Sequence, residues 1–184
     1  YCIAHRLEDG GEIWRCGNLH PKGNYNKTLR FVASPACAPG LIVVPTAKKG
    51  KVIGIRPGGS GDITDSEEFV AWTLPRNTPD VPSPVIHEGM VYLCRENGNL
   101  MALDAETGKL VYEERTTRER HRSSPVYADG NIYLTARNGV VTVVRAGKDF
   151  EVIARNDVGE PITASPVFAN GRIYLRTLKS LYAI

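Results

Sequence analysis

Residues 122–134 read RSSPVYADGNIYL, and the chain carries closely similar stretches at three other places. Residues 81–93 read VPSPVIHEGMVYL, residues 163–175 read TASPVFANGRIYL, and residues 32–44 form a weaker copy, VASPACAPGLIVV. The Ser-Pro pairs begin at positions 34, 83, 124 and 165, so they are spaced by 49, 41 and 41 residues. A period of about 40–50 residues is typical of one blade of a β-propeller. The repeat therefore predicts an all-β propeller.

The composition favours this all-β fold over a helical one. The chain has 184 residues, of which 42% are hydrophobic and 23% are charged, and its formal net charge is +3. These values exclude a disordered tail and a collagen-like fibre. No run approaches the roughly 20 apolar residues of a membrane-spanning helix. The 18 glycines and 12 prolines interrupt helical hydrogen bonding and suit a protein rich in turns.

One period divides into four short antiparallel strands, which we call a to d. In the clearest copy, strand a is the Ser-Pro-Val segment 83–85, strand b is 91–93, strand c is 100–103, and strand d begins at position 110. Asn-Gly pairs at 97–98 and 138–139 predict tight b-to-c hairpins in which both residues accept positive φ. Proline is compatible with strand a because an unpaired sheet edge needs no N–H donor.

The repeat divides the chain into consecutive blades of one propeller. We expect strands c and d of a blade with a linker at 1–30, and strands a, b and c of the last blade at 162–184. Three whole blades are expected between them, at 31–80 with an insertion at 58–65, at 81–121 and at 122–161. Both ends supply a strand c, so simple strand exchange does not close a ring. We interpret the chain as a C-terminal part of a larger propeller, whose missing blades are expected partners.

Residues 102–112, ALDAETGKLVY, resemble the A-x-D-x-x-T-G-K-x-x-W signature of the pyrroloquinoline-quinone (PQQ) repeat. Tyr112 replaces the signature tryptophan, whereas residues 4–14 keep Trp14 but have Arg6 in place of the aspartate. The whole chain is similar to bacterial PQQ-like β-propeller proteins related to the outer-membrane assembly lipoprotein BamB and to quinoprotein alcohol dehydrogenases. This resemblance implies a periplasmic or extracellular location. It indicates a fold and does not fix a chemistry, because this fold is shared widely.

The resemblance implies structural roles for the signature residues. In the family the tryptophan and the glycine dock neighbouring blades, which assigns packing and turn roles to Trp14, Asp104, Thr107, Gly108 and Tyr112. A quinone-dependent dehydrogenase would show a vicinal Cys-Cys pair, a calcium site and a catalytic aspartate, and the sequence has no adjacent cysteines. We therefore expect no catalytic residue and no cofactor. PQQ with calcium is implied only if the chain is part of such a dehydrogenase.

The insertion carries a candidate cation site at Asp62, Thr64 and Asp65. Oxygen ligands on a glycine-rich loop suit calcium, although the spacing is not that of an EF-hand. The alternative is an ordinary surface excursion between strands c and d.

The four cysteines form no zinc-binding pattern. Cys2 and Cys16 face each other if residues 4 and 14 pair across a hairpin, which allows either a disulfide or two buried free thiols. We assign packing roles to Cys37 and Cys94. The four histidines lie in different repeat contexts, and no sequence pattern pairs one with a nucleophile.

The repeat register separates the charges onto two faces. In a propeller the d-to-a and b-to-c loops emerge on one face, and the a-to-b and c-to-d loops on the other. The first face receives 15 basic and 5 acidic residues, and the second receives 5 basic and 11 acidic residues. The small net charge therefore conceals a basic face and an acidic face. The densest basic segment is residues 115–122, RTTRERHR.

We expect the basic face to bind a partner. Arginine favours bidentate contact with carboxylates or phosphates, and the candidate residues are Arg95, Arg115, Arg118, Arg120, Arg122 and Arg137. Aromatic residues do not interleave with them, which argues against nucleic acid. The sequence thus predicts a non-enzymatic scaffold for an acidic protein or another polyanion. Two alternatives stay open: the charges serve only solubility, or the chain is part of a PQQ-dependent dehydrogenase whose catalytic blades lie outside it.

Overall fold

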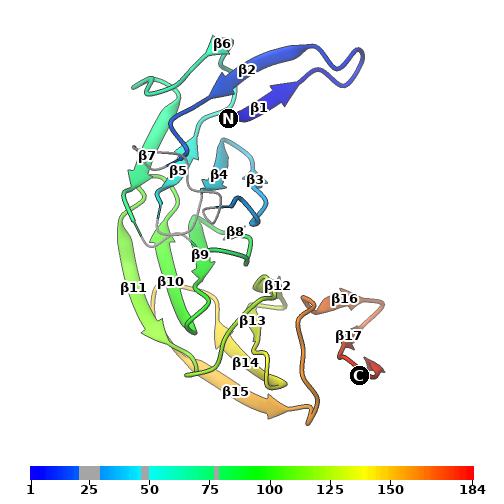
Figure 1. The fold of residues 1–184 in the computed structure, drawn as a ribbon. Coiled ribbons are helices and arrows are strands. Elements are labelled where there is room, and N and C mark those ends of the chain that lie inside the picture. The colour runs from blue at the N-terminus through cyan, green and yellow to red at the C-terminus, as the bar shows by residue number, and fades with distance from the viewer. Residues whose placement is uncertain (21–29, 47–49, 77–78) are drawn as a thin grey trace.

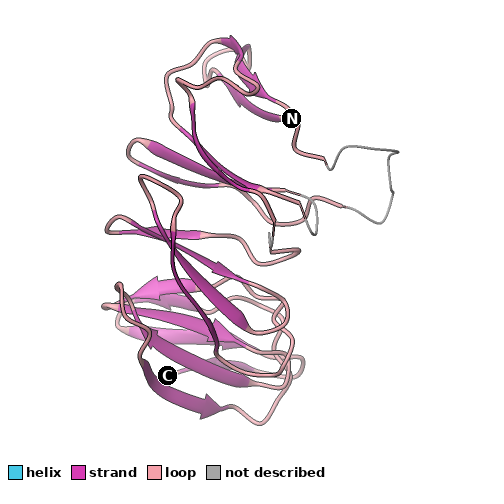
Figure 2. Cartoon of the chain, turned by 90° about the vertical axis from the view of Figure 1, so that its left-hand side faces the viewer, coloured by secondary structure: helices cyan, strands magenta, loops and turns pink. Residues whose placement is uncertain are grey.

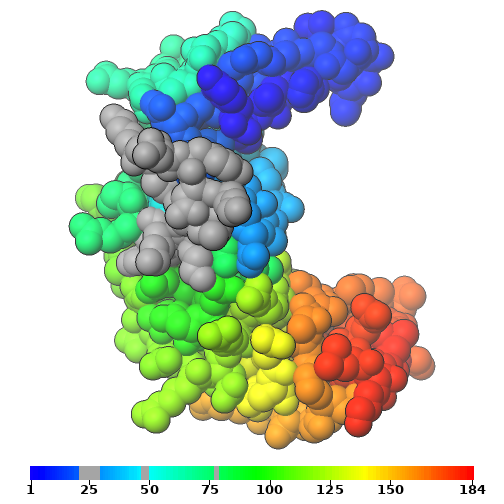
Figure 3. Space-filling view, in the orientation of Figure 1, coloured from blue at the N-terminus to red at the C-terminus, as the bar shows by residue number. Residues whose placement is uncertain are grey.

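A computed structural model describes residues 1–20, 30–46, 50–76 and 79–184, and this part of the chain is built from eighteen strands without a helix. The strands form five sheets that follow one another along an arc (Figure 1). A view turned by 90° shows the sheets stacked one on the next (Figure 2). In the space-filling view the outline is a C, open between the N-terminal and C-terminal sheets (Figure 3). The predicted all-β propeller architecture is confirmed.

Three sheets are four-stranded antiparallel meanders, in the predicted order from a to d. The first comprises β3 (Ala36–Ala38), β4 (Leu41–Pro45), β5 (Val52–Ile55) and β7 (Val70–Leu74). The second comprises β8 (Val85–His87), β9 (Met90–Cys94), β10 (Asn99–Asp104) and β11 (Leu110–Arg115). The third comprises β12 (Val126–Ala128), β13 (Asn131–Thr135), β14 (Val140–Arg145) and β15 (Val152–Asp157).

The two end sheets have three strands each. The C-terminal sheet contains β16 (Val167–Ala169), β17 (Arg172–Arg176) and β18 (Leu181–Ala183), which are strands a, b and c. The N-terminal sheet contains β1 (Cys2–His5) and β2 (Glu12–Cys16), and β6 (Gly61–Asp62) adds to β2 in parallel. The insertion at 58–65 is therefore more than the surface excursion that we considered, because it supplies a strand to the preceding sheet.

Two local details of the predicted blade are wrong. Strand a begins one residue after the proline in all four copies, so the proline costs the sheet no hydrogen bond. In the b-to-c hairpins only the glycine has positive φ, 88° at Gly98 and 103° at Gly139. The turns with two positive φ values are the a-to-b turns, at Glu88-Gly89, Asp129-Gly130 and Asn170-Gly171.

The serine of each Ser-Pro pair links its blade to the next one. The backbone N–H of Ser34 donates to Oγ of Ser83, that of Ser83 to Oγ of Ser124, and that of Ser124 to Oγ of Ser165, each at 2.9 Å. Just beyond these serines, β8 contacts both β3 and β12 along the concave side of the arc (Figure 1). The serine thus recurs because its hydroxyl satisfies a backbone donor of the preceding blade.

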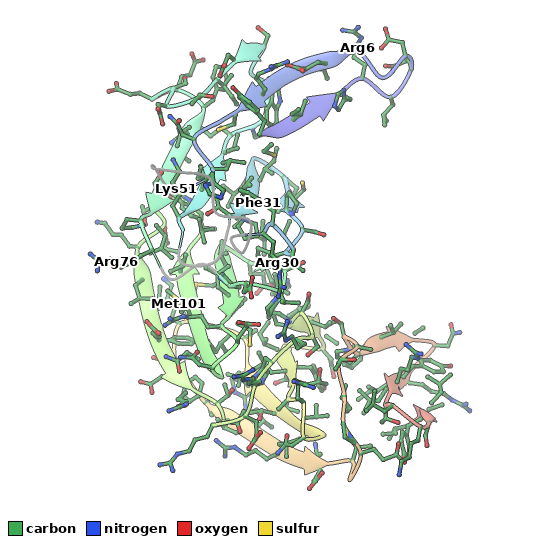
Figure 4. All side chains as sticks on the ribbon, viewed as in Figure 1. Arg6, Arg30, Phe31, Lys51, Arg76 and Met101 are labelled. Atoms are coloured by element: carbon green, nitrogen blue, oxygen red, sulfur yellow. The ribbon has the colours of Figure 1, made fainter. Side chains whose placement is uncertain are left out.

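The hydrophobic core lies between sheets, so the central strands are buried on both faces. All five residues of β9 are buried. Val91 and Leu93 pack toward the preceding sheet, and Tyr92 packs toward the following one. Met101, labelled on β10 in Figure 4, belongs to the same core as Val91 and Leu93. Burial on both faces explains why strands b and c read as nearly continuous apolar runs.

Trp72 fixes the contact between the first two whole blades. Its indole Nε1 donates to the carbonyl of Ala105 at 2.8 Å. Its ring lies against Gly108, where an added Cβ would approach Trp72 Cδ2 to 2.5 Å. A side chain larger than hydrogen at position 108 would therefore collide with the indole.

The strand d position of Trp72 recurs in the other sheets. In each of these sheets, strands c and d shift their pairing register at one point. The equivalent residue of strand d pairs with the strand c residue that directly precedes this shift. The residues at this position are, in chain order, Trp14, Trp72, Tyr112 and Ala154. The first three dock a ring on the next blade, and the fourth does not.

We expect Gly108→Ala to destabilise the protein more than Gly130→Ala. Both glycines have left-handed φ, 67° and 73°, so either substitution costs about 1 kcal/mol through backbone strain. Only at Gly108 does the new Cβ meet the Trp72 ring, whereas nothing lies within 4 Å at Gly130. Overpacking should cost Gly108→Ala a further ~1–3 kcal/mol in the free energy of unfolding, measured in urea. Equal losses in the two variants would contradict the docking role of Trp72.

Candidate functional site

The loops of the predicted basic face interlock through main-chain hydrogen bonds. Thr116 donates twice to the carbonyl of Gly98, from its backbone N and from Oγ1, each at 2.9 Å. The N–H of His121 donates to Glu96 O at 3.0 Å. The N–H of Arg137, in the b-to-c turn of the next blade, donates to Arg120 O at 2.8 Å. The d-to-a loop at 116–122 is therefore held between two b-to-c turns.

Each b-to-c turn needs its glycine because a d-to-a loop passes close to it. A Cβ at Gly98 would lie 2.1 Å from Thr117 O, and one at Gly139 would lie 2.4 Å from Glu160 O. The Asn-Gly pattern located these turns correctly. The requirement for glycine comes from this close approach together with its positive φ.

Three of the six predicted arginines form ion pairs or hydrogen bonds within the protein that hold these loops in place. Arg95 Nη1 lies 3.0 Å from Oε1 of Glu113, and Arg122 Nε lies 3.5 Å from Oε1 of Glu96. The side chains of Arg95 and Arg122 are only 29% and 33% exposed. Arg115 donates to two loop carbonyls, at 3.3 and 3.4 Å. These arginines are therefore largely occupied by the protein itself.

The other three candidates, Arg118, Arg120 and Arg137, are exposed, and we call them the open arginines. Within the described part of the chain, no hydrogen bond or ion pair holds their guanidinium groups. The backbone bond between Arg137 and Arg120 brings two of them together from different blades. Four further basic residues that we assigned to this face, Lys22, Lys27, Lys48 and Lys49, lie outside the described residues.

A buried histidine lies inside the same loop. His121 has no exposed surface, and its backbone pairs with Ala136 of the next sheet. Burial lowers the pKa of His121 below its ordinary value. The residues 41 positions before and after it are Asp80 and Ile162, which are also buried. The sequence analysis did not distinguish His121 from the other histidines, because only the repeat position reveals its burial.

The candidate cation ligands hold the insertion against the N-terminal sheet. Thr64 Oγ1 accepts from the backbone N–H of Gly17 at 2.6 Å, and Asp65 Oδ2 accepts from Asn18 Nδ2 at 2.5 Å. Asp62 accepts from Thr64 within the loop, which lowers the pKa of this carboxyl group. Among the residues that the structure describes, no group of three or more His, Cys, Asp or Glu could hold a metal ion.

Cys2 and Cys16 are directly paired residues of β1 and β2, and both thiols are free. Burial raises the pKa of each, so both are weak nucleophiles at neutral pH. Cys94 is fully buried, and burial raises its pKa to about 12. Cys37 is exposed, so the packing role that we expected for it is wrong.

The signature residues form a turn and a docking contact. Asp104 Oδ1 accepts from the backbone N–H and the hydroxyl of Thr107, at 2.8 and 2.7 Å, which lowers the pKa of Asp104. The ring of Tyr112 meets Phe150 of the next sheet edge-on, with centroids 5.6 Å apart. Trp14 is buried beside Ile53 and Ile55 of the following sheet. The sequence analysis missed Trp72 because the insertion lengthens the c-to-d connection before it.

A family described as "Outer membrane protein assembly factor BamB" matches residues 3–184, which is nearly the whole chain. The chain belongs to this family. Among curated proteins, no significant match was found.

Solved structures show the same fold as this BamB-family chain. BamB from Moraxella catarrhalis superposes with a TM-score of 0.70 at 14% identity, covering 95% of this chain and 50% of that one. The computationally designed Ika4 protein gives a TM-score of 0.71 at 12% identity, covering 95% and 98%. A quinohemoprotein alcohol dehydrogenase from Pseudomonas putida gives 0.61 at 13% identity, covering 82% and 29%. The chain thus spans about half the length of the BamB structure. No helix in the described part is long and apolar enough to cross a membrane.

We expect the stability of this BamB-family chain to fall as the pH is lowered from 7.5 to 5.5. Because burial lowers the pKa of His121 in the folded state, the unfolded chain binds a proton more readily. Above pH 6.5, the pKa of histidine in the unfolded chain, His121 is neutral in both states and the full stability is present. Stability is lost as the pH falls from 6.5 toward the lower pKa of His121 in the folded state. At pH 5.5 the loss due to this residue does not exceed about 1.4 kcal/mol.

The matched variant is His121→Ile, which introduces the residue found at the same position of the next repeat. Urea unfolding at both pH values should show a smaller decrease for the variant than for the wild-type chain. An identical decrease in both proteins would show that other groups cause the pH dependence.

Proposed function

We propose that this chain is part of a non-enzymatic binding propeller whose open arginines hold an acidic segment of a partner protein. One observation carries the proposal: Arg118, Arg120 and Arg137 are exposed and uncompensated on loops that hydrogen bonds fix on both sides. Cations on fixed loops lose less conformational freedom on binding than cations on mobile loops. A partner with several carboxylates would relieve the repulsion among them.

The chemistry of arginine favours carboxylates as ligands. A guanidinium group offers a planar pair of N–H donors that matches the two oxygens of a carboxylate. The protein already uses this chemistry within the same loops, where Arg95 meets Glu113 and Arg122 meets Glu96. An acidic partner segment would repeat these contacts at the open arginines.

The family supports a binding role and a location outside the cytoplasm. Its description names an outer membrane protein assembly factor, and one matching structure is BamB. On this basis we propose that the chain acts in the periplasm and contacts other proteins there. The partner itself is identified here only by its chemistry.

A dehydrogenase is the second candidate, because a quinohemoprotein alcohol dehydrogenase and a europium-containing methanol dehydrogenase share the fold. The europium enzyme superposes with a TM-score of 0.54 at 13% identity, covering 69% of this chain and 24% of that one. The described residues fit its metal chemistry poorly. Asp62, Thr64 and Asp65 form hydrogen bonds that hold the insertion, and no other acidic group forms a cluster.

Titration with PQQ and calcium separates the candidates. We expect no saturable binding, and saturable binding at one site per chain would overturn the non-enzymatic assignment.

We expect Arg118→Glu/Arg120→Glu to weaken binding of a labelled peptide of eight glutamates at least tenfold in 50 mM salt, measured by fluorescence anisotropy. Raising the salt to 300 mM should weaken wild-type binding, because exposed charges are screened. The matched control is Lys109→Glu/Lys148→Glu, which changes the net charge equally on exposed residues of the opposite face. Equal weakening by both double variants would mean that net charge alone attracts the peptide and would contradict a defined site.

A further inference from the structure

A small cavity of about 250 Å³ lies on the acidic face, between the sheet β8–β11 and the sheet β12–β15. On the first sheet it is lined by the a-to-b turn at 87–89 and by Asp104 at the end of β10. The c-to-d turn of the next blade, at 146–148, lines the other side. Both sheets have all four strands, so the cavity adjoins no incomplete blade.

The residues that line the cavity give it a net negative charge. Glu88 and Asp104 are acidic and Lys148 is basic, with histidine counted as neutral. Hydrogen bonds from Thr107 lower the pKa of Asp104, and the positive charge of Lys148 adds to this effect. Lys148 itself is exposed, and within the described part of the chain no ion pair holds its ammonium group. A ligand with one positive charge would therefore balance the cavity.

Contacts between the two blades hold the walls in place. The ring of His87 stacks on the ring of Tyr127, with centroids 3.5 Å apart and an interplanar angle of 23°. The hydroxyl of Tyr92, which is only 1% exposed, accepts from the backbone N–H of Gly147 at 2.7 Å. Glu88 Oε1 lies 3.7 Å from His87 Nε2. The polar groups of the cavity are thus positioned before a ligand arrives, which reduces the entropy lost on binding.

Among the three whole blades, this set of side chains occurs once. The last residue of strand a is His87 here and alanine in the other copies, at Ala38, Ala128 and Ala169. The last residue of strand c is Asp104 here and Arg145 in the next blade. Because blades with alanine form the same sheet, the repeat itself does not require the imidazole of His87.

The size and shape of the cavity favour a lysine side chain as the ligand. Sites for drug-sized molecules occupy roughly 300–1,000 Å³, so this cavity fits a smaller group. Met90, 4% exposed, and Ala146 offer an apolar surface to an alkyl chain. The carboxylates of Glu88 and Asp104 belong to different elements. An ammonium group can turn its three donors toward separate acceptors, whereas guanidinium has a fixed planar fork.

We infer that this cavity binds the ammonium group of a lysine side chain from a partner protein. Glu88 and Asp104 accept hydrogen bonds from the ammonium group, and the alkyl chain packs against Met90. This site goes beyond the proposed function, because it lies on the face opposite to the open arginines and does not depend on them.

The test is an NMR titration of the whole 184-residue chain at pH 7.5 with Nα-acetyl-lysine amide. The matched probe is Nα-acetyl-norleucine amide, which has no ammonium group. We expect the lysine probe to give a saturable shift of the backbone amide of Gly147, which lies in the wall of the cavity, and the norleucine probe to give none. The absence of saturation with the lysine probe, or equal saturation with both probes, would overturn the inference.

Two matched variants locate the binding site. Glu88→Asn and Asp129→Asn each remove one carboxylate from the same position of neighbouring a-to-b turns, and both introduce the residue of the last repeat, Asn170. Both positions have left-handed φ, 43° and 46°, which asparagine tolerates. We expect Glu88→Asn to weaken lysine binding at least about fivefold. Asp129 does not line the cavity, so Asp129→Asn should leave binding nearly unchanged. Equal weakening would show that the charge of the whole face attracts the probe, and would overturn the site.

Two further measurements test the sign of the charge and the source of the amine. Lys148→Gln removes the basic side chain of the cavity and should strengthen lysine binding, whereas weaker binding would contradict a site for a cation. Pentylamine carries the same alkylammonium group without peptide groups. Saturation with pentylamine but not with the lysine probe would overturn the assignment to a protein side chain. The glutamate peptide tests the open arginines separately, so a failure of one proposal is distinguishable from a failure of the other.

Discussion

The three inner sheets of this chain depend on burying both of their faces against neighbouring sheets. A blade of four short strands encloses no core of its own, and β9 shows the consequence, since none of its five residues is exposed. Stability in such a chain is approximately a sum of contacts between neighbours. The two contacts among the three whole blades each combine an inner serine hydrogen bond, as from Ser83 to Ser124, with an outer docked ring, such as Trp72 on Gly108. The hydrogen bond and the ring lie at opposite ends of the blade and together fix its orientation.

This two-point attachment is what allows the loops to present fixed charges. The d-to-a loop at 116–122 connects two blades whose relative position is already determined, and bonds from Thr116 and to Arg120 hold it on both sides. Three of the six candidate arginines make contacts within the protein, and the three open arginines are exposed to solvent. A surface of this kind differs from a cluster of mobile charges, because its geometry exists before a partner arrives.

The sequence predicted the propeller because the repeat places glycine, proline and apolar residues at the same steps of each blade. It also placed Cys2 opposite Cys16, since pairing within a hairpin is local. It could not reveal the serine hydrogen bonds, whose donor and acceptor lie 41 or 49 residues apart. It missed Trp72 and β6 for a common reason: the insertion breaks the spacing of the repeat, and β6 pairs with a different sheet.

The candidate site was predicted less completely than the fold, because counting charges treats every arginine alike. Whether an arginine is available depends on which carboxylate folding brings beside it, and Glu96 and Glu113 are brought to Arg122 and Arg95. Glu160 lies on the same face, yet its carboxylate accepts hydrogen bonds from Thr177, Ser180 and Tyr182.

Those three hydroxyl groups lower the pKa of Glu160, so it stays ionised without an arginine partner. An acidic residue of this face is thus compensated by neutral donors, whereas the open arginines receive no carboxylate from the described chain. The described chain thus provides hydrogen-bond donors to Glu160 and leaves the open arginines exposed to solvent. Under the proposed function, a negatively charged partner supplies these counter-charges.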